Sequence, residues 1–300
     1  MSAERLGLDV EALVRLERMS IAANVRVRGS TLGKRRSRRT GSSLDFADYR
    51  LYAPGDDVRQ IDWNAYGRSG KPFVKLFHDE QELPLRLWVD ASASMNTGGE
   101  RSVGDNKLLY AKRLAACVGY MALCGYDRVS AFAFAQEASS SLPPLRGKGS
   151  AQRLFRFLAD VEPMKEGDLY RSLAQPKTLP RGPGLTWIFS DFLYESGVRE
   201  TLNVLLAAKQ QLVVVQVLSP EELDPSLAGD VRLIDVETDA GKEVSVSTRV
   251  LRAYREALEA HVSALKAFCR ERHIAYALAS TDVPAAAWVA SALRGAGALV

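Results

Sequence analysis

The chain has 300 residues, of which 47% are hydrophobic and 25% charged, and its formal net charge is +4. This composition is that of an ordinary soluble globular protein, and no apolar run approaches the ~18 residues that a membrane-spanning helix requires. The N-terminus lacks the apolar core of a signal peptide, so the sequence predicts a cytoplasmic protein without a membrane span.

The three cysteines, Cys117, Cys124 and Cys269, have no paired spacing. An odd number of unpaired cysteines excludes a disulfide framework and the common zinc motifs. Cys117 and Cys124 are seven residues apart in a helical pattern, which is typical of buried free thiols.

The excess positive charge lies in the N-terminal quarter, because residues 1–80 carry 15 Lys and Arg against 11 Asp and Glu. Residues 1–23 form one expected division of the chain, with a helix over 3–20. Residues 24–82 form a second. They begin with a basic arm, residues 34–39, and continue with interleaved aromatic, acidic and arginine residues around a Pro-Gly turn. We expect short β-strands with paired charges in this second division.

Residues 83–300 form the third expected division, in which apolar strands alternate with helical patterns. Strands are predicted at 85–90, 127–134, 185–191, 212–218 and 273–279, with a hairpin over 231–247. Helices are predicted at 107–124, 150–162, 168–175, 196–209, 249–271 and 283–294. This alternation indicates an α/β fold with a mostly parallel, doubly wound sheet and helices on both faces.

Polar oxygen donors follow two of the predicted strands. The apolar run 85–89 ends at Asp90, and Ser92 and Ser94 follow at alternate positions. Asp191 ends a second strand in the same way. Because the carboxyl ends of parallel strands meet at one edge, these side chains are expected to converge there. Carboxylate and hydroxyl oxygens suit Mg²⁺ or Mn²⁺ rather than zinc.

The pattern Asp90-x-Ser92-x-Ser94, with Ser190-Asp191 after a later strand, resembles the metal-ion-dependent adhesion site of von Willebrand factor type A domains. In that family the Asp, both Ser, a Thr from a second loop and an Asp from a third surround one Mg²⁺. The resemblance implies that the ion keeps an open position, which a partner's carboxylate often fills.

The N-terminal motifs narrow the resemblance. In chain order they read Arg36-Ser37-Arg38-Arg39, Gly41-Ser42, Leu44, Phe46, Asp48-Tyr49-Arg50, Pro54-Gly55-Asp56-Asp57, Arg59, Ile61-Asp62-Trp63 and Glu82-Leu83. This order resembles the bacterial family known as domain of unknown function 58, over roughly residues 30–280. The family is typically encoded beside MoxR-type AAA+ ATPases. The resemblance implies that it acts with them in chaperone-like maturation or metal insertion.

The second loop departs from the family pattern. Where a threonine is expected, this chain reads Lys165-Glu166-Gly167-Asp168-Leu169. A site without that hydroxyl is expected to hold its ion weakly, to complete the shell with water, or to recruit Asp168. Mg²⁺ accepts water ligands readily, so a missing hydroxyl does not by itself abolish binding.

These observations predict a non-enzymatic adaptor that works with a MoxR-type ATPase, with its client protein, or with both. The expected link is Mg²⁺ or Mn²⁺ held by Asp90, Ser92, Ser94 and Asp191, whose open position attracts an acidic side chain. Further candidate contacts with the partner lie in the second division, and they are Arg36, Arg38, Arg39, Asp56, Asp57, Arg59, Asp62 and Trp63. The charged residues among them equally fit a charge network internal to the chain.

Three alternatives stay open. The first is a structural interaction module with a vestigial, empty metal site, which Gly167 favours. The second is a nucleic-acid binder using residues 34–39, although a net charge of +4 is modest for that role and no nucleic-acid partner is expected. The third is a hydrolase, but His78, His261 and His273 show no motif spacing to a serine.

Overall fold

The computed structural model describes residues 2–17, 19, 37–40, 46–79, 84–97, 106–135, 138–164, 167–175, 178–225, 229–234 and 241–295. The chain forms two compact units. The larger unit combines residues 1–23 with 83–300, and the smaller unit consists of residues 24–82. The expected N-terminal division, residues 1–23, therefore belongs to the larger unit.

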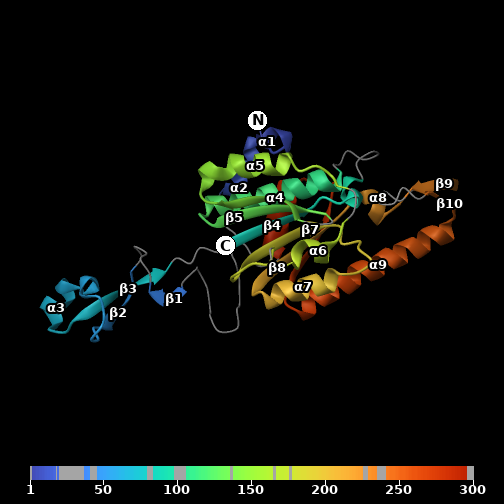
Figure 1. The fold of residues 1–300 in the computed structure, drawn as a ribbon. Helices are drawn as coiled ribbons and strands as arrows, with labels where there is room; N and C mark the ends of the chain where they lie inside the picture. The colour runs from blue at the N-terminus through green and yellow to red at the C-terminus, as the bar shows by residue number, and fades with distance from the viewer. Residues whose placement is uncertain are drawn as a thin grey trace. The chain divides into compact units, whose positions relative to one another are not determined.

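The larger unit is built on a six-stranded sheet with the order β11-β8-β7-β4-β5-β6 (Figure 1). Its strands are β4 (Pro84–Asp90), β5 (Arg128–Phe134), β6 (Ala138–Leu145), β7 (Gly184–Ser190), β8 (Gln210–Leu218) and β11 (Ala275–Ser280). Every neighbouring pair is parallel except β5 and β6. The predicted mostly parallel α/β sheet is confirmed.

Helices cover both faces of this sheet (Figure 1). One face carries α1 (Ser2–Arg5), α2 (Val10–Glu17), α4 (Lys107–Cys124), α5 (Ala151–Ala159) and α10 (Ala285–Gly295). The other carries α6 (Leu169–Leu173), α7 (Val198–Ala207) and α9 (Thr248–Glu271). Along β4, Leu87 and Val89 join the first apolar cluster and Trp88 joins the second, as the alternation of a strand requires.

The central helix α4 has the bounds that the sequence predicts. It begins after Asn106, whose side chain accepts a hydrogen bond from the backbone N–H of Leu109, and 15 of its 18 residues are buried. Gly119 allows α4 to lie close to the sheet. A Cβ there would stand 2.9 Å from Leu87 Cδ1 and 2.5 Å from Leu154 Cδ2.

Two expectations for this unit are wrong in detail. The helix expected over 3–20 is two helices, α1 and α2, because Gly7 takes a left-handed conformation with φ +62° between them. Strand β6 was not expected, because its sequence Ala-Ser-Ser-Ser-Leu-Pro-Pro-Leu shows no regular apolar alternation. Its two prolines are tolerated because β6 lies at an edge of the sheet.

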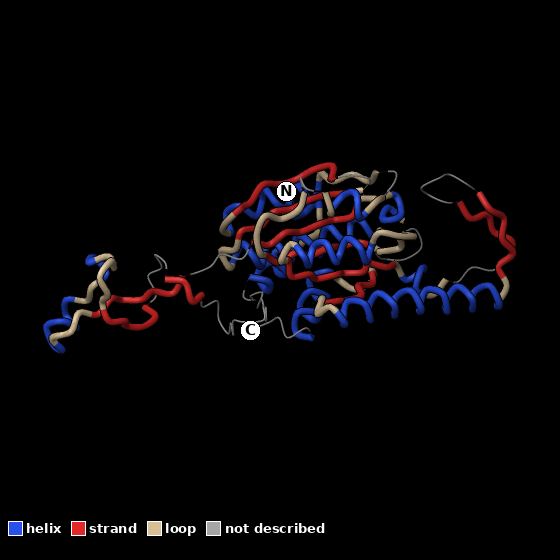
Figure 2. The backbone as a smooth tube through the Cα atoms, turned by 60° about the horizontal axis from the view of Figure 1, so that its bottom comes forward, coloured by secondary structure: helices blue, strands red, loops and turns tan. Residues whose placement is uncertain are grey.

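The remaining elements of the larger unit lie along α9. The expected hairpin over 231–247 appears as antiparallel β9 (Gly229–Ile234) and β10 (Gly241–Val246), and its expected turn at 239–241 lies largely outside the described residues. The short helix α8 (Pro220–Leu223) follows β8. Helix α9 runs well past the edge of the sheet, with the hairpin next to its N-terminal end (Figure 2).

The smaller unit contains three antiparallel strands in the order β1-β3-β2, namely β1 (Ser37–Thr40), β2 (Phe46–Leu51) and β3 (Phe73–Asp79). Between β2 and β3 lies the helix α3 (Trp63–Ser69), which was not expected. The expected paired charges are present, with Arg50 Nη2 2.7 Å from Asp56 Oδ1 and Lys75 Nζ 3.2 Å from Asp62 Oδ2.

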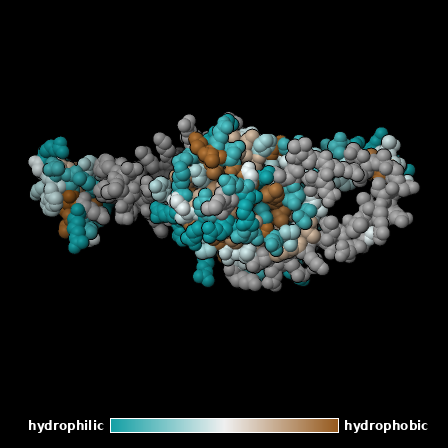
Figure 3. Space-filling model, turned by 90° about the horizontal axis from the view of Figure 1, so that it is seen from above, coloured by the Kyte–Doolittle hydropathy of each residue, from teal (hydrophilic) through white to brown (hydrophobic). Residues whose placement is uncertain are grey.

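Apolar side chains are exposed on the smaller unit, and part of this surface is visible in Figure 3. The large exposed apolar residues are Tyr49, Leu51, Val58, Trp63 and Tyr66. Among the described residues of this unit, Val74 is the one hydrophobic side chain that is fully buried.

None of the helices in the described part of the chain combines the length and the apolar character that a membrane span requires.

Candidate functional site

The candidate site lies where the strand order reverses. From β4 the chain first adds β5 and β6 on one side, and then returns to place β7 on the other side of β4. Open α/β sheets bind ligands at such a switch point, outside the carboxyl ends of the strands. Asp90 is the last residue of β4 and Asp191 follows β7, so the two acids meet there. We call this edge, with the loops that follow β4 and β7, the rim.

Asp90 is fully buried, and both of its carboxylate oxygens accept hydrogen bonds. Oδ1 accepts the backbone N–H of Ser92 at 2.9 Å. Oδ2 accepts the hydroxyls of Ser190 at 2.6 Å and of Tyr194 at 2.5 Å. Burial, together with the nearby charge of Asp191, raises the pKa of Asp90 to about 6. Burial and the charge of Asp90 also raise the pKa of Tyr194, which keeps its hydroxyl a donor.

Asp191 is paired with a buried lysine. Its Oδ1 accepts the backbone N–H of Leu193 at 3.1 Å, and its Oδ2 lies 2.8 Å from Lys107 Nζ. The same Nζ lies 2.5 Å from Oε1 of Glu222 in α8. Burial alone lowers the pKa of Lys107, but Asp191 and Glu222 outweigh it and the net shift is upward. Lys107 is therefore a charged ammonium held between two carboxylates.

The two serines of the motif lie beside Asp90. Ser92 is buried, and its Oγ is 3.1 Å from the Oγ of Ser94. After Asp191, Phe192 takes a left-handed conformation with φ +54°, which is rare for a bulky side chain. Its backbone N–H donates to Ser190 Oγ at 3.0 Å. Backbone strain of this kind clusters at functional sites.

The second loop brings Gly167 to the rim and directs Asp168 elsewhere. A Cβ on Gly167 would stand 2.8 Å from Ser92 Cβ and 3.0 Å from Tyr194 Cε1. Asp168 accepts the backbone N–H of Arg171 at the start of α6, and its Oδ2 lies 3.3 Å from Arg171 Nε. The carboxylate of Asp168 is therefore used as a helix cap rather than at the rim.

The residues predicted as metal ligands are thus gathered at the rim, and their carboxylate oxygens already have partners within the chain. Each oxygen of Asp90 and Asp191 already accepts a hydrogen bond, and an ammonium ion lies against Asp191. A side chain at position 167 would crowd both Ser92 and Tyr194, because its Cβ would stand 2.8 Å from Ser92 Cβ and 3.0 Å from Tyr194 Cε1.

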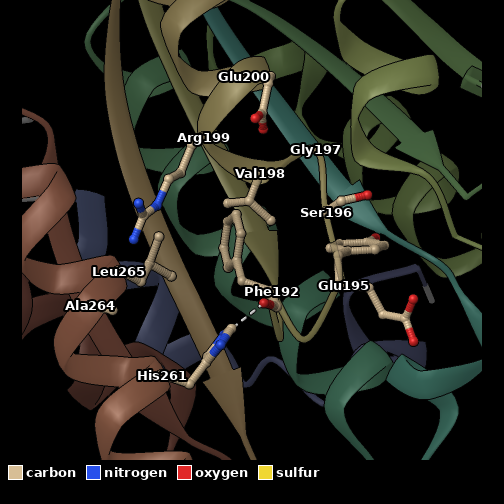
Figure 4. A pocket seen from close by; sticks show the side chains of 11 residues that line it. Phe192, Glu195, Ser196, Gly197, Val198, Arg199, Glu200, His261, Ala264 and Leu265 are labelled. Atoms are coloured by element: carbon tan, nitrogen blue, oxygen red, sulfur yellow. Dashed lines mark hydrogen bonds between the residues drawn. The ribbon is translucent and has the colours of Figure 1, made fainter.

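A cavity of about 330 Å³ adjoins the rim (Figure 4). Its wall includes Tyr194, the residue that donates to Asp90, and Phe192. The far wall comes from α9, where His261 Nε2 lies 2.9 Å from the backbone oxygen of Phe192. The remaining residues that line the cavity are Glu195, Ser196, Gly197, Val198, Arg199, Glu200, Ala264 and Leu265. The lining of the cavity is therefore mixed, with apolar side chains beside the charged groups of Glu195, Arg199 and Glu200.

The candidate contact residues of the smaller unit divide into two groups. Asp56 pairs with Arg50, and Asp57 accepts the backbone N–H of Arg59. Asp62 caps α3, so each of these acids has its partners within the unit. The second group, Arg59 and Trp63, is exposed, and the exposed fraction of Trp63 is 64%.

The basic arm, residues 34–39, lies largely outside the described residues. Arg36 lies outside the described residues, and so do the side chains of Arg38 and Arg39, whose backbone belongs to β1.

Three residues of the rim were not predicted from the sequence. Tyr194 and Glu222 belong to no sequence motif that would mark them. Lys107 had a signal, since it begins a helix that is otherwise apolar on the side facing the sheet. A charged residue at such a position needs a buried partner.

The fold and the rim define an α/β domain with a mostly parallel sheet and a polar switch point. The model of the family described as "Protein of unknown function DUF58" matches residues 48–264, and the chain belongs to this family. The family predicted from the sequence motifs is confirmed.

Two similar proteins are uncharacterized. Protein Rv1480 of Mycobacterium tuberculosis is 28% identical over 224 residues, which cover 74% of this chain and 69% of that protein. Protein Mb1516 of Mycobacterium bovis shows the same identity and coverage.

Solved structures were also found. The conserved hypothetical protein BatB from Bacteroides thetaiotaomicron matches with a TM-score of 0.41 and 15% identity, over 72% of this chain and 98% of that one. An aerotolerance-related membrane protein from Bacteroides fragilis matches with a TM-score of 0.45 and 16% identity, over 71% of this chain and 97% of that one.

Proposed function

We propose that this protein is a non-enzymatic interaction module that works with a MoxR-type AAA+ ATPase, with the client of that ATPase, or with both, in the cytoplasm. The identity of the partner is inferred from the family that the motifs between Arg36 and Trp63 resemble. In this role the protein would bind a partner during chaperone-like maturation or metal insertion.

The observation that carries the proposal is the cavity beside the rim. Its volume of about 330 Å³ lies at the lower end of the range for small-molecule sites, and it can receive one or two side chains of a partner. It shares Tyr194 with the hydrogen-bond network around Asp90, so an occupant of the cavity would be linked to the switch point through this side chain. Val198, which is partly exposed, supplies apolar contact area, and Leu265 and the buried Phe192 lie behind it in the wall.

The chemistry of the rim supports binding rather than catalysis. The Ser92 and Ser94 hydroxyls lie against each other, and His261 is engaged with a backbone oxygen. In the described residues, no histidine is bonded to a serine as a nucleophile and its base would be. The contact with the partner is therefore assigned to the cavity rather than to an exposed ion.

The test is the affinity of the purified full chain for a MoxR-type AAA+ ATPase from the same organism. Ala264→Trp fills the cavity and is expected to weaken binding by about tenfold or more. Ala253→Trp is the matched control, because Ala253 is exposed on the same helix and does not line the cavity. It is expected to leave the affinity unchanged.

A chelator is expected to leave the wild-type affinity unchanged, since the cavity needs no ion. If the wild-type chain showed no affinity for the ATPase, the partner would be wrong. If both tryptophan variants bound as the wild type does, the cavity would not be the contact.

A further inference from the structure

The rim contains a buried positive charge of its own. Lys107 is 1% exposed, and its Nζ contacts Asp191 Oδ2 at 2.8 Å and Glu222 Oε1 at 2.5 Å. Lysine is almost never fully buried unless it is paired. We propose that the ammonium group of Lys107 takes the place of a divalent cation at the rim, which makes this a metal-free site held by an internal cation. This inference does not depend on the proposed partner.

Both carboxylates that hold the ammonium group are themselves fixed by hydrogen bonds. Glu222 belongs to a capping box at the start of α8, in which Ser219 N donates to Glu222 Oε2 at 2.9 Å and Glu222 N donates to Ser219 Oγ at 3.3 Å. This arrangement fixes the carboxylate and leaves Oε1 for Lys107. Asp191 is fixed in turn by the backbone N–H of Leu193. The two acceptors are therefore oriented in advance, as the ligands of a metal site would be.

A divalent ion and this lysine exclude each other. Oδ2 of Asp191 lies 2.8 Å from the ammonium group, so an ion bound to this oxygen would lie beside Lys107. The two positive charges would then be only about 4 Å apart and would repel strongly in a buried environment, so the ion could bind there only after Lys107 had left. Its departure would leave Glu222 without its buried partner.

Gly167 and Tyr194 complete the same arrangement. The Tyr194 hydroxyl donates to Asp90 Oδ2, the second carboxylate of the expected metal site. Glycine at position 167 fits beside the tyrosine ring and Ser92, because a Cβ there would stand 3.0 Å from Tyr194 Cε1 and 2.8 Å from Ser92 Cβ. The glycine in place of the expected threonine, the tyrosine and the lysine thus fit together as one set. In this set Tyr194 donates a hydrogen bond to Asp90, and Lys107 pairs with Asp191.

The test is Mn²⁺ binding by the full chain, measured by electron paramagnetic resonance and calorimetry. The wild type is expected to show no saturable binding at the rim. Lys107→Met keeps an unbranched apolar side chain of similar length but removes the ammonium group, and is expected to bind Mn²⁺ at least about tenfold more tightly than the wild type. Adding Asp191→Asn to this variant is expected to abolish the gain.

Lys112→Met is the matched control. Lys112 lies in the same helix and is 9% exposed, but its Nζ approaches the backbone oxygen of Ala159 at 3.4 Å rather than the rim. This variant is expected to bind no Mn²⁺. If Lys107→Met gained no affinity over the wild type, or if Lys112→Met gained as much, the inference would be overturned.

A measurement on the wild type covers the case in which Lys107→Met does not fold. Bound Mn²⁺ broadens the NMR signals of nearby nuclei, so the backbone amides of Ser92 and Leu193 report on an ion at the rim. No selective broadening is expected at millimolar Mn²⁺. Selective, saturable broadening of these two amides would show that the wild-type rim binds the ion and would refute the role of Lys107.

Discussion

Asp62 determines how α3 begins. Its Oδ1 accepts the backbone N–H groups of Asn64 at 2.9 Å and Ala65 at 3.1 Å, and its Oδ2 accepts the hydroxyl of Tyr49 at 2.8 Å. The hydrogen bond from Tyr49, followed by the other donors, holds the pKa of Asp62 well below its usual range. A carboxylate of this kind stabilises the folded state above the pKa of the unfolded chain, and that stability is lost as the pH falls.

We therefore expect α3 to lose stability below about pH 4, where the unfolded chain begins to take up protons that folded Asp62 resists. The measurement is an NMR titration of the Asn64 and Ala65 amides. Asp62→Asn is expected to remove this part of the pH dependence. Asp57→Asn, whose carboxylate accepts one backbone N–H, is expected to leave it intact. Identical titrations of wild type and Asp62→Asn would assign the effect to another group.

Single residues of the rim were only partly predictable. Asp90 and Asp191 were identified because an acid after an apolar strand marks the carboxyl edge of a parallel sheet. The partners of these acids include residues of α4 and of the loop after β7, up to 104 residues away in the sequence. No local pattern encodes such contacts, because they depend on how the helices pack against the sheet.

At the scale of elements, α9 has two different halves. Leu265, Phe268 and Cys269 near its C-terminal end are buried in the apolar cluster on one face of the sheet. Toward its N-terminal end, Val250 and Tyr254 are each 40% exposed. Packing energy should therefore come mainly from the C-terminal half.

Truncation within this helix tests the difference. Leu265→Ala is expected to destabilise the larger unit by about 2–5 kcal/mol, the usual cost of emptying a core position. Val250→Ala is expected to change stability by no more than about 0.5 kcal/mol. Both values follow from urea denaturation monitored by circular dichroism. Equal losses at the two positions would mean that the N-terminal half is covered as well.

Elements with a strong period were predicted well, and those without one were not. The apolar pattern of α4 gave its bounds, Lys107–Cys124, without error. Helix α3, with the sequence Trp-Asn-Ala-Tyr-Gly-Arg-Ser, has no apolar face and buries none of its side chains, so hydrophobic periodicity could not reveal it. Its capping residue, Asp62, was the available signal.

At the scale of the whole molecule, tryptophan distinguishes the two units. Trp63 of the smaller unit is 64% exposed, whereas Trp88, Trp187 and Trp288 of the larger unit are 1%, 4% and 7% exposed. Solvent quenchers should therefore reach one tryptophan and leave the other three shielded.

Acrylamide quenching of the native protein is expected to show one accessible fraction that disappears in Trp63→Phe. The unfolding transition monitored by fluorescence is expected to keep its midpoint in this variant, because the buried tryptophans dominate the signal change. If Trp63 were shielded from acrylamide in the isolated wild-type chain, its exposed aromatic surface would be covered by another part of the protein or by a second copy.

The lysine at the rim has a consequence for mass action. A bound ion occupies its site according to its concentration in the surroundings, and a chelator can remove it. Lys107 is attached to α4, so its effective concentration at Asp191 is set by the fold and does not vary with the medium. A rim held in this way is constitutive. Its state depends on the folding of the larger unit and does not change with the concentration of magnesium or manganese.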